Sequence, residues 1–278
     1  MVTYDQKERG NLVAYNKTGS YPVLLDEPSI AAGVRHLLDK VDGPVFVCLP
    51  TPMLPGGDVD LSIVRAMVHL IDEVAGGSHS ACGTSPVRRD VILKSTVPPG
   101  TTESLQGRFT NVVFCPEFLR EVSAEEDFQG QDHVILGGEP SASTRALFYK
   151  ALPDATQILV APRVAEMCKY VVNCFLATKV SFANEMRQVC DAAGVDYAQA
   201  VACATLDPRL GKSHWEVPGP DGHRGFGGSC FPKDLNGMIR FAQGVGVIPN
   251  LLEAAWENNL RYRPERDWEQ LKGRAVAE

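Results

Sequence analysis

The sequence lacks long apolar runs, closely spaced cysteine pairs and an excess of positive charge. No apolar run approaches the length that a membrane span needs, and the first eight residues are too polar for a signal peptide. The eight cysteines include no C-x-x-C pair, so the pattern indicates neither zinc nor a disulfide framework. A net charge of −7 argues against nucleic acid as a partner. We therefore expect a cytoplasmic protein with free thiols, no membrane partner and no metal site.

What is present is the composition of a globular protein, 44% hydrophobic and 22% charged over 278 residues. Through the first 160 residues, short apolar segments alternate with helical patterns over 29–40 and 61–75. This alternation is typical of a doubly wound, mostly parallel sheet. The segments that we predict to be strands are 2–4, 45–49, 91–93, 111–115, 134–136 and 157–160, and we expect an exposed loop over 76–86.

The pattern changes after residue 160. Pro162 opens a long helical pattern from 164 to about 193, and beyond residue 195 only helix and loop signals occur. The sequence therefore predicts an α/β protein with two domains. A Rossmann-like, mostly parallel sheet domain occupies 1–162, and a long central helix with an all-helical domain occupies 163–278.

The front of the sequence leaves no room for a glycine loop. A dinucleotide-binding fold starts with a strand, a G-x-G-x-x-G loop and a helix, and its second strand ends in an acidic residue. Residues 2–5 look like the end of that second strand, with Asp5 as the acid. We therefore expect a sheet that is truncated at its front, although a solvated N-terminal carboxylate explains Asp5 equally well.

The most distinctive motif is the loop Gly225-Phe226-Gly227-Gly228-Ser229-Cys230-Phe231-Pro232-Lys233-Asp234. Its glycines allow the backbone to approach a ligand closely. Asp234 is placed to cap the helical pattern over 235–242. Cys230, beside Lys233 and just before that helix, lies where positive charge favours the thiolate. A turn with a structural cysteine is the simpler explanation of such a loop by itself, but the polar motifs described next favour a nucleophile.

Polar groups also follow three predicted strands. Thr51 stands in a Pro-Thr-Pro turn, Thr96 follows a strand end, and Glu117 and Glu121 are four residues apart after the strand 111–115. In an open parallel sheet, ligands lie beyond the carboxyl ends of the strands. Turn chemistry or a solvated acidic face explains each group singly, whereas three such strand ends in succession indicate one site.

Two further groups stand out in the second half. Lys169 and Asn173 are four residues apart and interrupt the apolar stripe of the long helix. A buried lysine is costly unless it is paired, so Lys169 is a candidate for function, with extension of its ammonium to solvent as the alternative. Arg209 lies in the turn 207–211, where its guanidinium fork could clamp a phosphate or a sugar.

In their order along the chain, these motifs resemble those of the UDP-glucose 6-dehydrogenase family. The matching segments are Leu49-Pro50-Thr51-Pro52, Lys94-Ser95-Thr96-Val97-Pro98, Pro116-Glu117-Phe118-Leu119-Arg120-Glu121, Lys169-x-x-x-Asn173, Asp207-x-Arg209-Leu210-Gly211 and the cysteine loop, and they lie between about residue 2 and residue 262. Phenylalanine after the cysteine is more similar to the UDP-glucose branch than to the GDP-mannose branch, where leucine usually follows. The chain looks like a short form without the family's first βα unit and C-terminal UDP-binding domain.

The resemblance implies NAD-dependent oxidation of the C6 alcohol of UDP-glucose to UDP-glucuronate. Two hydride transfers would proceed through a thiohemiacetal and a thioester of Cys230. Lys169 and Asn173 would stabilise the oxyanion. Asp234, with Thr96 and Glu117 around an ordered water, would serve the proton transfers.

The resemblance also implies which residues contact the ligands. The NAD contacts would be Asp5, Thr51, Thr96, Glu121 and Lys233, and the substrate contacts Glu117, Phe118, Leu119, Lys169, Asn173, Arg209 and Gly227. A homodimer through the central helix would bring Arg209 to the sugar site across the dimer. The alternatives are another nucleotide-sugar 6-dehydrogenase, for GDP-mannose or a UDP-N-acetylhexosamine, and a non-catalytic remnant that binds nucleotide sugars.

Overall fold

The computed structural model describes residues 2–4, 12–16, 19–23, 30–40, 43–78, 88–119 and 123–278. Its main sheet has five strands in the order β4 (Val45–Val47), β5 (Arg89–Leu93), β6 (Thr110–Phe114), β7 (His133–Gly137) and β8 (Thr156–Val160). The pairs β4–β5, β5–β6 and β7–β8 are parallel, and β6 meets β7 antiparallel at Phe114 and Gly137. The predicted mostly parallel sheet is therefore confirmed.

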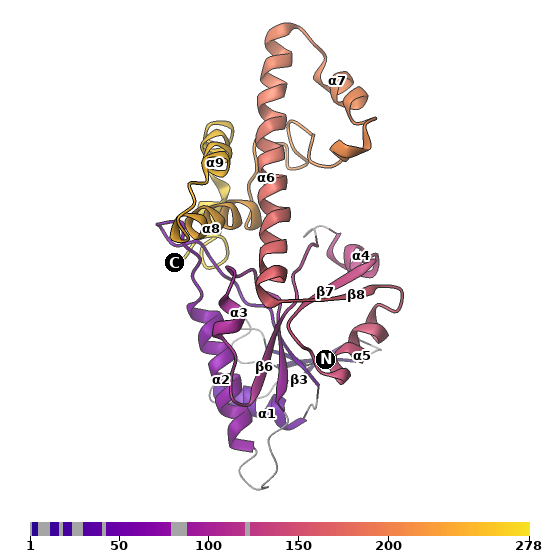
Figure 1. Cartoon of the computed structure of the whole chain (residues 1–278), viewed down its shortest axis with the longest axis vertical. Coiled ribbons are helices and arrows are strands. Elements are labelled where there is room, and N and C mark those ends of the chain that lie inside the picture. Colours follow the sequence, from indigo (N-terminus) through magenta and orange to yellow (C-terminus); the bar gives the residue numbers. More distant parts are fainter. Residues whose placement is uncertain are drawn as a thin grey trace.

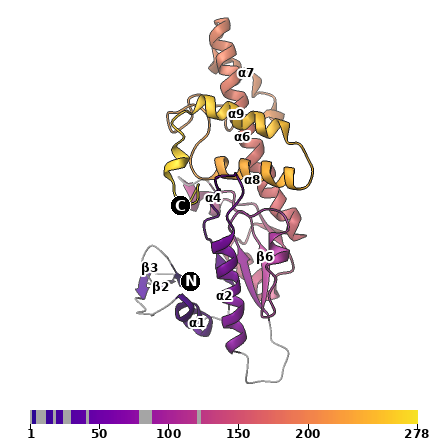
Figure 2. The ribbon, with the colours of Figure 1, turned by 90° about the vertical axis from the view of Figure 1, so that its left-hand side faces the viewer.

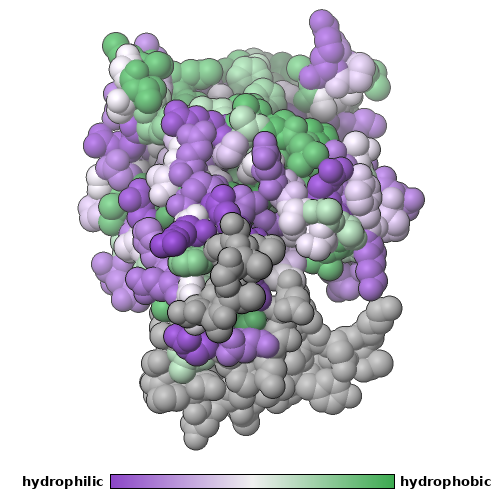
Figure 3. All heavy atoms as spheres, turned by 60° about the horizontal axis from the view of Figure 1, so that its bottom comes forward, coloured by the Kyte–Doolittle hydropathy of each residue, from purple (hydrophilic) through white to green (hydrophobic). Residues whose placement is uncertain are grey.

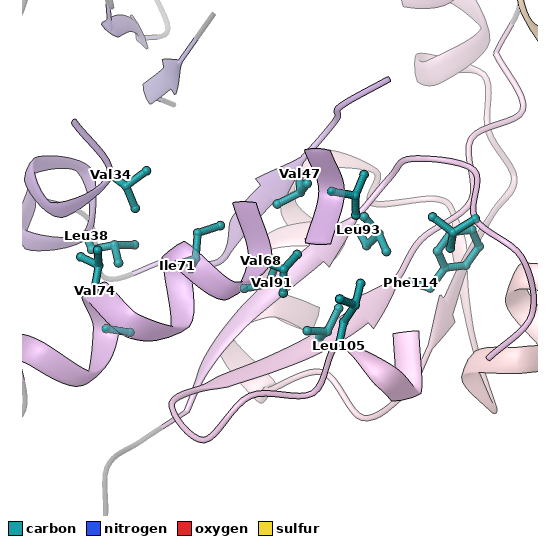
Figure 4. Close-up of a cluster of buried hydrophobic side chains, with 14 of the residues drawn as sticks. Val34, Leu38, Val47, Val68, Ile71, Val74, Val91, Leu93, Leu105 and Phe114 are labelled. Carbon is teal, nitrogen blue, oxygen red and sulfur yellow. The ribbon is translucent and has the colours of Figure 1, made fainter. Parts of the chain in front are cut away.

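Helices cover both faces of this sheet because β5 and β6 are apolar on both sides. Val91 and Leu93 of β5 pack with α1 (Ile30–Lys40) and α2 (Ser62–Ser78), as Figure 4 shows. Ile92 points the other way, into a second cluster with Phe148 of α5 (Ala142–Ala151). Successive side chains of a strand point to opposite faces, so an unbroken apolar run is what a doubly covered strand requires.

Residues 2–4 form the predicted strand, but their expected place in the main sheet is wrong. β1 (Val2–Tyr4) pairs antiparallel with β2 (Leu12–Asn16), which pairs with β3 (Gly19–Val23), in a separate three-stranded sheet. Figure 2 shows β2 and β3 beside α1, apart from the main sheet. An apolar segment of three residues does not specify its partner, and here the nearest strands in sequence pair with it. Asp5 lies outside the described residues.

The predicted loop over 76–86 is also wrong at its start, because α2 continues through Gly76 and Gly77 to Ser78. A glycine costs a helix only about 1 kcal/mol relative to alanine. At Gly76 the missing side chain leaves room for the ring of Phe109, since a Cβ there would lie 2.5 Å from Phe109 Cε2. The rest of this segment, residues 79–87, lies outside the described residues.

The second half is helical, as predicted. The central helix α6 (Pro162–Ala193) has 32 residues and is therefore about 48 Å long at ~1.5 Å per residue. It rises from the sheet, with α8 (Cys230–Gly244) and α9 (Asn250–Tyr262) packed against it and α7 (Tyr197–Ala204) near its far end (Figure 1). No described helix combines the length and apolar character that crossing a membrane requires. At the end of the molecule opposite α7, hydrophilic side chains cover much of the described surface (Figure 3).

Hydrogen bonds join the two halves of the chain. Glu166 of α6 is fully buried and accepts hydrogen bonds from the amides of Gly100 (2.5 Å) and Thr102 (2.7 Å), at the start of the short helix α3 (Thr101–Ser104). At the C-terminal end, the amide of Ala277 donates to Met53 O (2.9 Å) and the Met53 amide donates to Ala275 O (2.8 Å). The two sets of hydrogen bonds thus involve the segments that follow β4 and β5.

We expect Glu166→Gln to lower the free energy of unfolding by about 1–3 kcal/mol, because an amide offers one acceptor oxygen to two buried donors. Urea unfolding measures the change. Glu103→Gln is the matched control, since Glu103 lies on α3 in an exposed ion pair with Arg163 and should change stability little. Equal effects of the two substitutions would contradict the assigned role of Glu166.

Candidate active site at the carboxyl edge of the sheet

The carboxyl ends of three parallel strands meet at one edge. Val47, Leu93 and Phe114 are aligned across β4, β5 and β6, so Cys48, Lys94 and Cys115 follow side by side. The polar loops that the sequence placed after these strands therefore share one edge, as expected. The start of α6 lies next to it, because Ala165 packs in the same core cluster as Leu93 and Phe114.

Two hydroxyls tie the first two loops together. Ser95 Oγ donates to Leu49 O (2.7 Å) and accepts from the Leu49 amide (2.9 Å). Thr51 is buried, and its hydroxyl donates to Thr96 O (2.9 Å). The only hydroxyl proton of Thr51 is thus used to hold the loop of Thr96, and a contact of Thr51 with a cofactor stays a prediction.

The cysteine loop leads directly into α8, which starts at Cys230 with Ser229 as its N-cap residue. The prediction that Asp234 caps this helix is wrong, because Pro232 fits within the first helical turn and the helix begins earlier than expected. Cys230 is exposed, so a ligand can reach its thiol. Asp234 is four residues further on and therefore lies on the same side of the helix.

A buried polar cluster lies between α8 and α6. Asp234 is 1% exposed and accepts hydrogen bonds from Asn173 Nδ2 (2.5 Å) and from the ammonium of Lys233. Lys169 is also buried; its ammonium donates to Glu117 O and lies 5.3 Å from the ring centre of Phe118. The ammonium of Lys169 therefore turns inward, and the alternative of extension to solvent is wrong.

Burial lowers the pKa of Lys169, and the charges around it act in both directions. Asp234, Cys230 and Glu117 raise this pKa, whereas Lys233 lowers it. These groups therefore lie within electrostatic range of one ammonium. A lysine whose pKa is lowered exchanges its proton closer to neutral pH, which is a common property of groups in active sites.

Residues from the far end of the chain hold the cysteine loop in place. Asn259, fully buried on α9, accepts from the Phe226 amide (2.7 Å) and donates to Phe226 O (2.9 Å). Asp267 accepts from the Gly228 amide (2.8 Å) and from Arg263 Nε (2.6 Å). Neither Asn259 nor Asp267 was predicted, since a polar residue on a helix face has no local signal that distinguishes it from a solvated one.

Four predicted site residues remain, and each has a different surrounding or standing. Gly227 lies against the anchor of the loop, since a Cβ there would be 2.3 Å from Asp267 Oδ1. Leu119 is half-buried after β6. Arg209 is exposed on the turn Pro208–Leu210, where its guanidinium pairs with Asp207 (2.5 Å), and within the described residues it has no hydrogen bond to the cluster around Lys169. Glu121 lies outside the described residues.

Comparison with known proteins connects this fold to NAD-binding oxidoreductases. Residues 38–152 match the model described as "UDP-glucose/GDP-mannose dehydrogenase family, NAD binding domain", and residues 163–261 match the central domain of the same family. The two domain models together match most of the chain, in the family's order. The chain therefore belongs to the UDP-glucose/GDP-mannose dehydrogenase family.

Named relatives agree with this assignment. The UDP-glucose 6-dehydrogenase of Pseudomonas aeruginosa is 35% identical over 235 residues, and TuaD of Bacillus subtilis, also a UDP-glucose 6-dehydrogenase, is 33% identical over 229. These alignments cover 79% of this chain but only 49% and 46% of the relatives. The chain thus spans about half the length of the curated relatives that it matches.

Solved structures give the same result. A UDP-glucose dehydrogenase from the archaeon Pyrobaculum islandicum has a TM-score of 0.71 at 33% identity, with 88% of this chain and 55% of that chain covered. A GDP-mannose dehydrogenase from Pseudomonas aeruginosa has a TM-score of 0.54 at 28% identity, with 87% and 55% covered. The predicted Rossmann-like fold is therefore confirmed.

NAD is the cofactor that the matched domain identifies. β4 stands at the edge of the main sheet, with no described strand on its outer side. In a dinucleotide-binding sheet, the cofactor crosses the edge between such a strand and the strand that carries the glycine loop. The loops after β4 and β5 would therefore hold one side of NAD. The amides that start α3 are taken by Glu166, so they do not provide a pyrophosphate site.

The stability that the contacts of Asp267 with Arg263 and the Gly228 amide give to the cysteine loop should depend on pH. Burial alone would raise the pKa of Asp267, but hydrogen bonds from Arg263 and the Gly228 amide outweigh it and hold the pKa below its usual range. A carboxyl group with a lowered folded-state pKa contributes stability above its unfolded pKa of about 3.9, and this is lost as the pH falls through the folded value. Thermal unfolding followed from about pH 6 down to about pH 3 should therefore show a smaller loss for Asp267→Asn than for the wild type.

Asp154→Asn, at an exposed position, is the control for this experiment and should keep the pH dependence of the wild type. Identical pH dependence for Asp267→Asn and the wild type would show that Asp267 does not stabilise the loop through its charge.

Proposed function

We propose that this protein catalyses the NAD-dependent oxidation of the C6 alcohol of UDP-glucose to UDP-glucuronate, with Cys230 as the covalent nucleophile. The observation that supports this most strongly is an exposed cysteine at the first residue of α8, within electrostatic range of the buried Lys169, which lies on α6 with Asn173, the partner of Asp234. When bound, NAD supplies the hydride acceptor for both oxidations. The residues of the chain supply orientation, charge stabilisation and proton transfer.

In the first oxidation, the C6 hydroxyl gives up its proton to a water held by Asp234, Thr96 and Glu117. Lys169 and Asn173 donate hydrogen bonds to the oxygen as it becomes negative. Both donors are buried, so their hydrogen bonds are stronger than they would be in water. The product of this stage is an aldehyde.

The Cys230 thiolate then adds to the aldehyde carbon and forms a carbon–sulfur bond, which produces the same oxyanion beside Lys169 and Asn173. Loss of the second hydride from this thiohemiacetal leaves a thioester. Water adds to the thioester carbon, the carbon–sulfur bond breaks, and the sulfur leaves as a thiolate while the sugar leaves as a carboxylate. Asp234 and Glu117 take up the protons that this water releases.

We assign the ligand contacts as the family resemblance implies them. Thr51, Thr96 and Lys233 are assigned to NAD, and Glu117, Phe118, Leu119 and Gly227 line the sugar site together with Lys169 and Asn173. The relatives of 33–35% identity that carry the name UDP-glucose 6-dehydrogenase favour UDP-glucose over GDP-mannose, whose dehydrogenase is 28% identical. The described cysteines are free, and we place the reaction in the cytoplasm, where thiols stay reduced.

An apolar stripe on α6 favours a homodimer. Its residues are each more than half exposed and recur at intervals that keep them on one side of the helix; they are Val164, Val171, Phe175, Phe182 and Val189. Exposed apolar surface of this kind is typical of a protein–protein contact. We propose that two copies pack along this stripe and that Arg209 contributes to the sugar site across the dimer.

Replacement of Cys230 by serine should abolish the formation of UDP-glucuronate. Loss of the nucleophile commonly costs about 10³-fold or more in rate. NADH formation is measured with UDP-glucose, GDP-mannose and a UDP-N-acetylhexosamine, and the products are identified by mass spectrometry. Cys203→Ser, at another exposed cysteine on α7, is the control and should keep the wild-type rate.

Near-normal UDP-glucuronate production by Cys230→Ser would overturn the role of the thiol. Faster turnover of another nucleotide sugar would point to a different member of the family. Calorimetric binding of UDP-glucose without any NADH formation would point to a binding protein.

Phe175→Glu should convert the dimer to a monomer, because a carboxylate at the centre of the stripe would be buried without a partner. Sedimentation velocity measures the mass of each variant in solution. Leu147→Glu is the control, since Leu147 is an exposed apolar residue of α5, on the sheet domain. A dimer that persists in Phe175→Glu would place the interface elsewhere.

A further inference from the structure

We propose that Lys94 is a positioning residue that holds the Glu117 carboxylate in its catalytic orientation. Lys94 Nζ lies 2.9 Å from Glu117 Oε2, and the two side chains are 17% and 31% exposed. Glu117 is among the predicted site residues, whereas Lys94 is not. The inference rests on the proposed function, because the orientation matters only if Glu117 acts on the sugar.

Lys94 is well placed to control the segment after β6. It directly follows β5, the strand between β4 and β6, so its side chain leaves the middle of the sheet edge. Besides Glu117, its ammonium donates to Pro116 O (3.4 Å) and to Cys115 Sγ (3.5 Å). One ammonium therefore contacts three consecutive residues and fixes the turn from which Glu117 projects.

Glu117 is held from two directions. Lys94 of the sheet edge binds its carboxylate, and Lys169 of α6 donates to its backbone carbonyl. With the carbonyl and the carboxylate both bound, the side chain has little freedom to rotate away. A misplacement of a reacting group by about 1 Å can cost about 100-fold in rate, so this restraint has consequences for turnover.

The pKa values of the two lysines are shifted in opposite directions. Burial alone would lower the pKa of Lys94, but Cys115 and Glu117 outweigh it and raise the pKa, so Lys94 stays charged. Burial lowers the pKa of Lys169. Lys94, which keeps its charge, is therefore the lysine that orients Glu117. Lys169, whose pKa is lowered, is the lysine within electrostatic range of Asp234 and Cys230.

The test compares Lys94→Met, Lys94→Arg, Glu117→Gln and the double variant Lys94→Met/Glu117→Gln. We expect Lys94→Met to lower kcat for NADH formation with UDP-glucose by about 100-fold and to change KM by less than about threefold, because binding is kept and orientation is lost. Lys94→Arg keeps the charge and should recover kcat to within about tenfold of the wild type. In the Glu117→Gln background, Lys94→Met should lower kcat by less than about threefold, because the carboxylate that it orients is gone.

Arg240→Met is the control, since it removes a cation from an exposed ion pair with Asp58 (3.3 Å) and should leave kcat unchanged. Equal losses of kcat from Lys94→Met in the wild-type and Glu117→Gln backgrounds would overturn the inference. Wild-type kcat in Lys94→Met, or no recovery in Lys94→Arg, would also overturn it.

Unfolding midpoints of the same variants separate this inference from the proposed function. If the shift of the unfolding midpoint in the double variant differs from the sum of the shifts in Lys94→Met and Glu117→Gln, the two side chains interact, and this supports the pairing independently of activity. If the wild-type chain oxidises no nucleotide sugar, the proposed function fails, and with it the catalytic role of the pair. Additive midpoints together with full wild-type activity would overturn the inference and leave the proposed function intact.

Discussion

One face of α6 connects three parts of the molecule, and the candidate site depends on it. Glu166, Lys169 and Asn173 follow one another at intervals of three and four residues, so they project from the same side of the helix. Glu166 binds the loop after β5, Lys169 the segment after β6, and Asn173 the carboxylate of Asp234 on α8. A rotation of α6 about its axis would break all three contacts together. The helix thus fixes the position of the cysteine loop relative to the carboxyl edge of the sheet.

These contacts are polar and buried, and they add little net stability compared with apolar groups of the same volume, although removal of one partner alone is destabilising. A buried charge must replace its hydration with protein partners, and an apolar group of equal volume often stabilises a fold as well or better. The folding energy comes instead from the apolar clusters around β5 and between α6 and α8. Burying Lys169 and Asp234 therefore costs hydration energy that their contacts do not fully return as stability. Such side chains are expected where a protein keeps them for chemistry, which agrees with the proposed roles of these two residues.

Much of the fold could be predicted because periodicity is a local property. The apolar segment Val91–Leu93 indicated a strand, and the pattern after Pro162 indicated α6. Local sequence signals predicted the wrong helix ends where contacts with other residues decided the structure. Gly76 is helical, with the ring of Phe109 in the space that a side chain would occupy, and Asp234 binds Asn173 and Lys233 because the helix begins before it, at Cys230.

The sequence by itself determined which reactive groups the chain carries, their order, and the spacing that places Lys169 and Asn173 on one face. Only the tertiary structure decided what these groups meet. The amide of Asn259 holds Phe226 across 33 residues of sequence, and Lys94 meets Glu117 because β5 and β6 are neighbours. The periods of helices and strands are set by backbone geometry within a few residues, so the sequence reveals them. A contact between two elements forms only after their apolar faces have packed, because this packing decides which polar groups are left to pair.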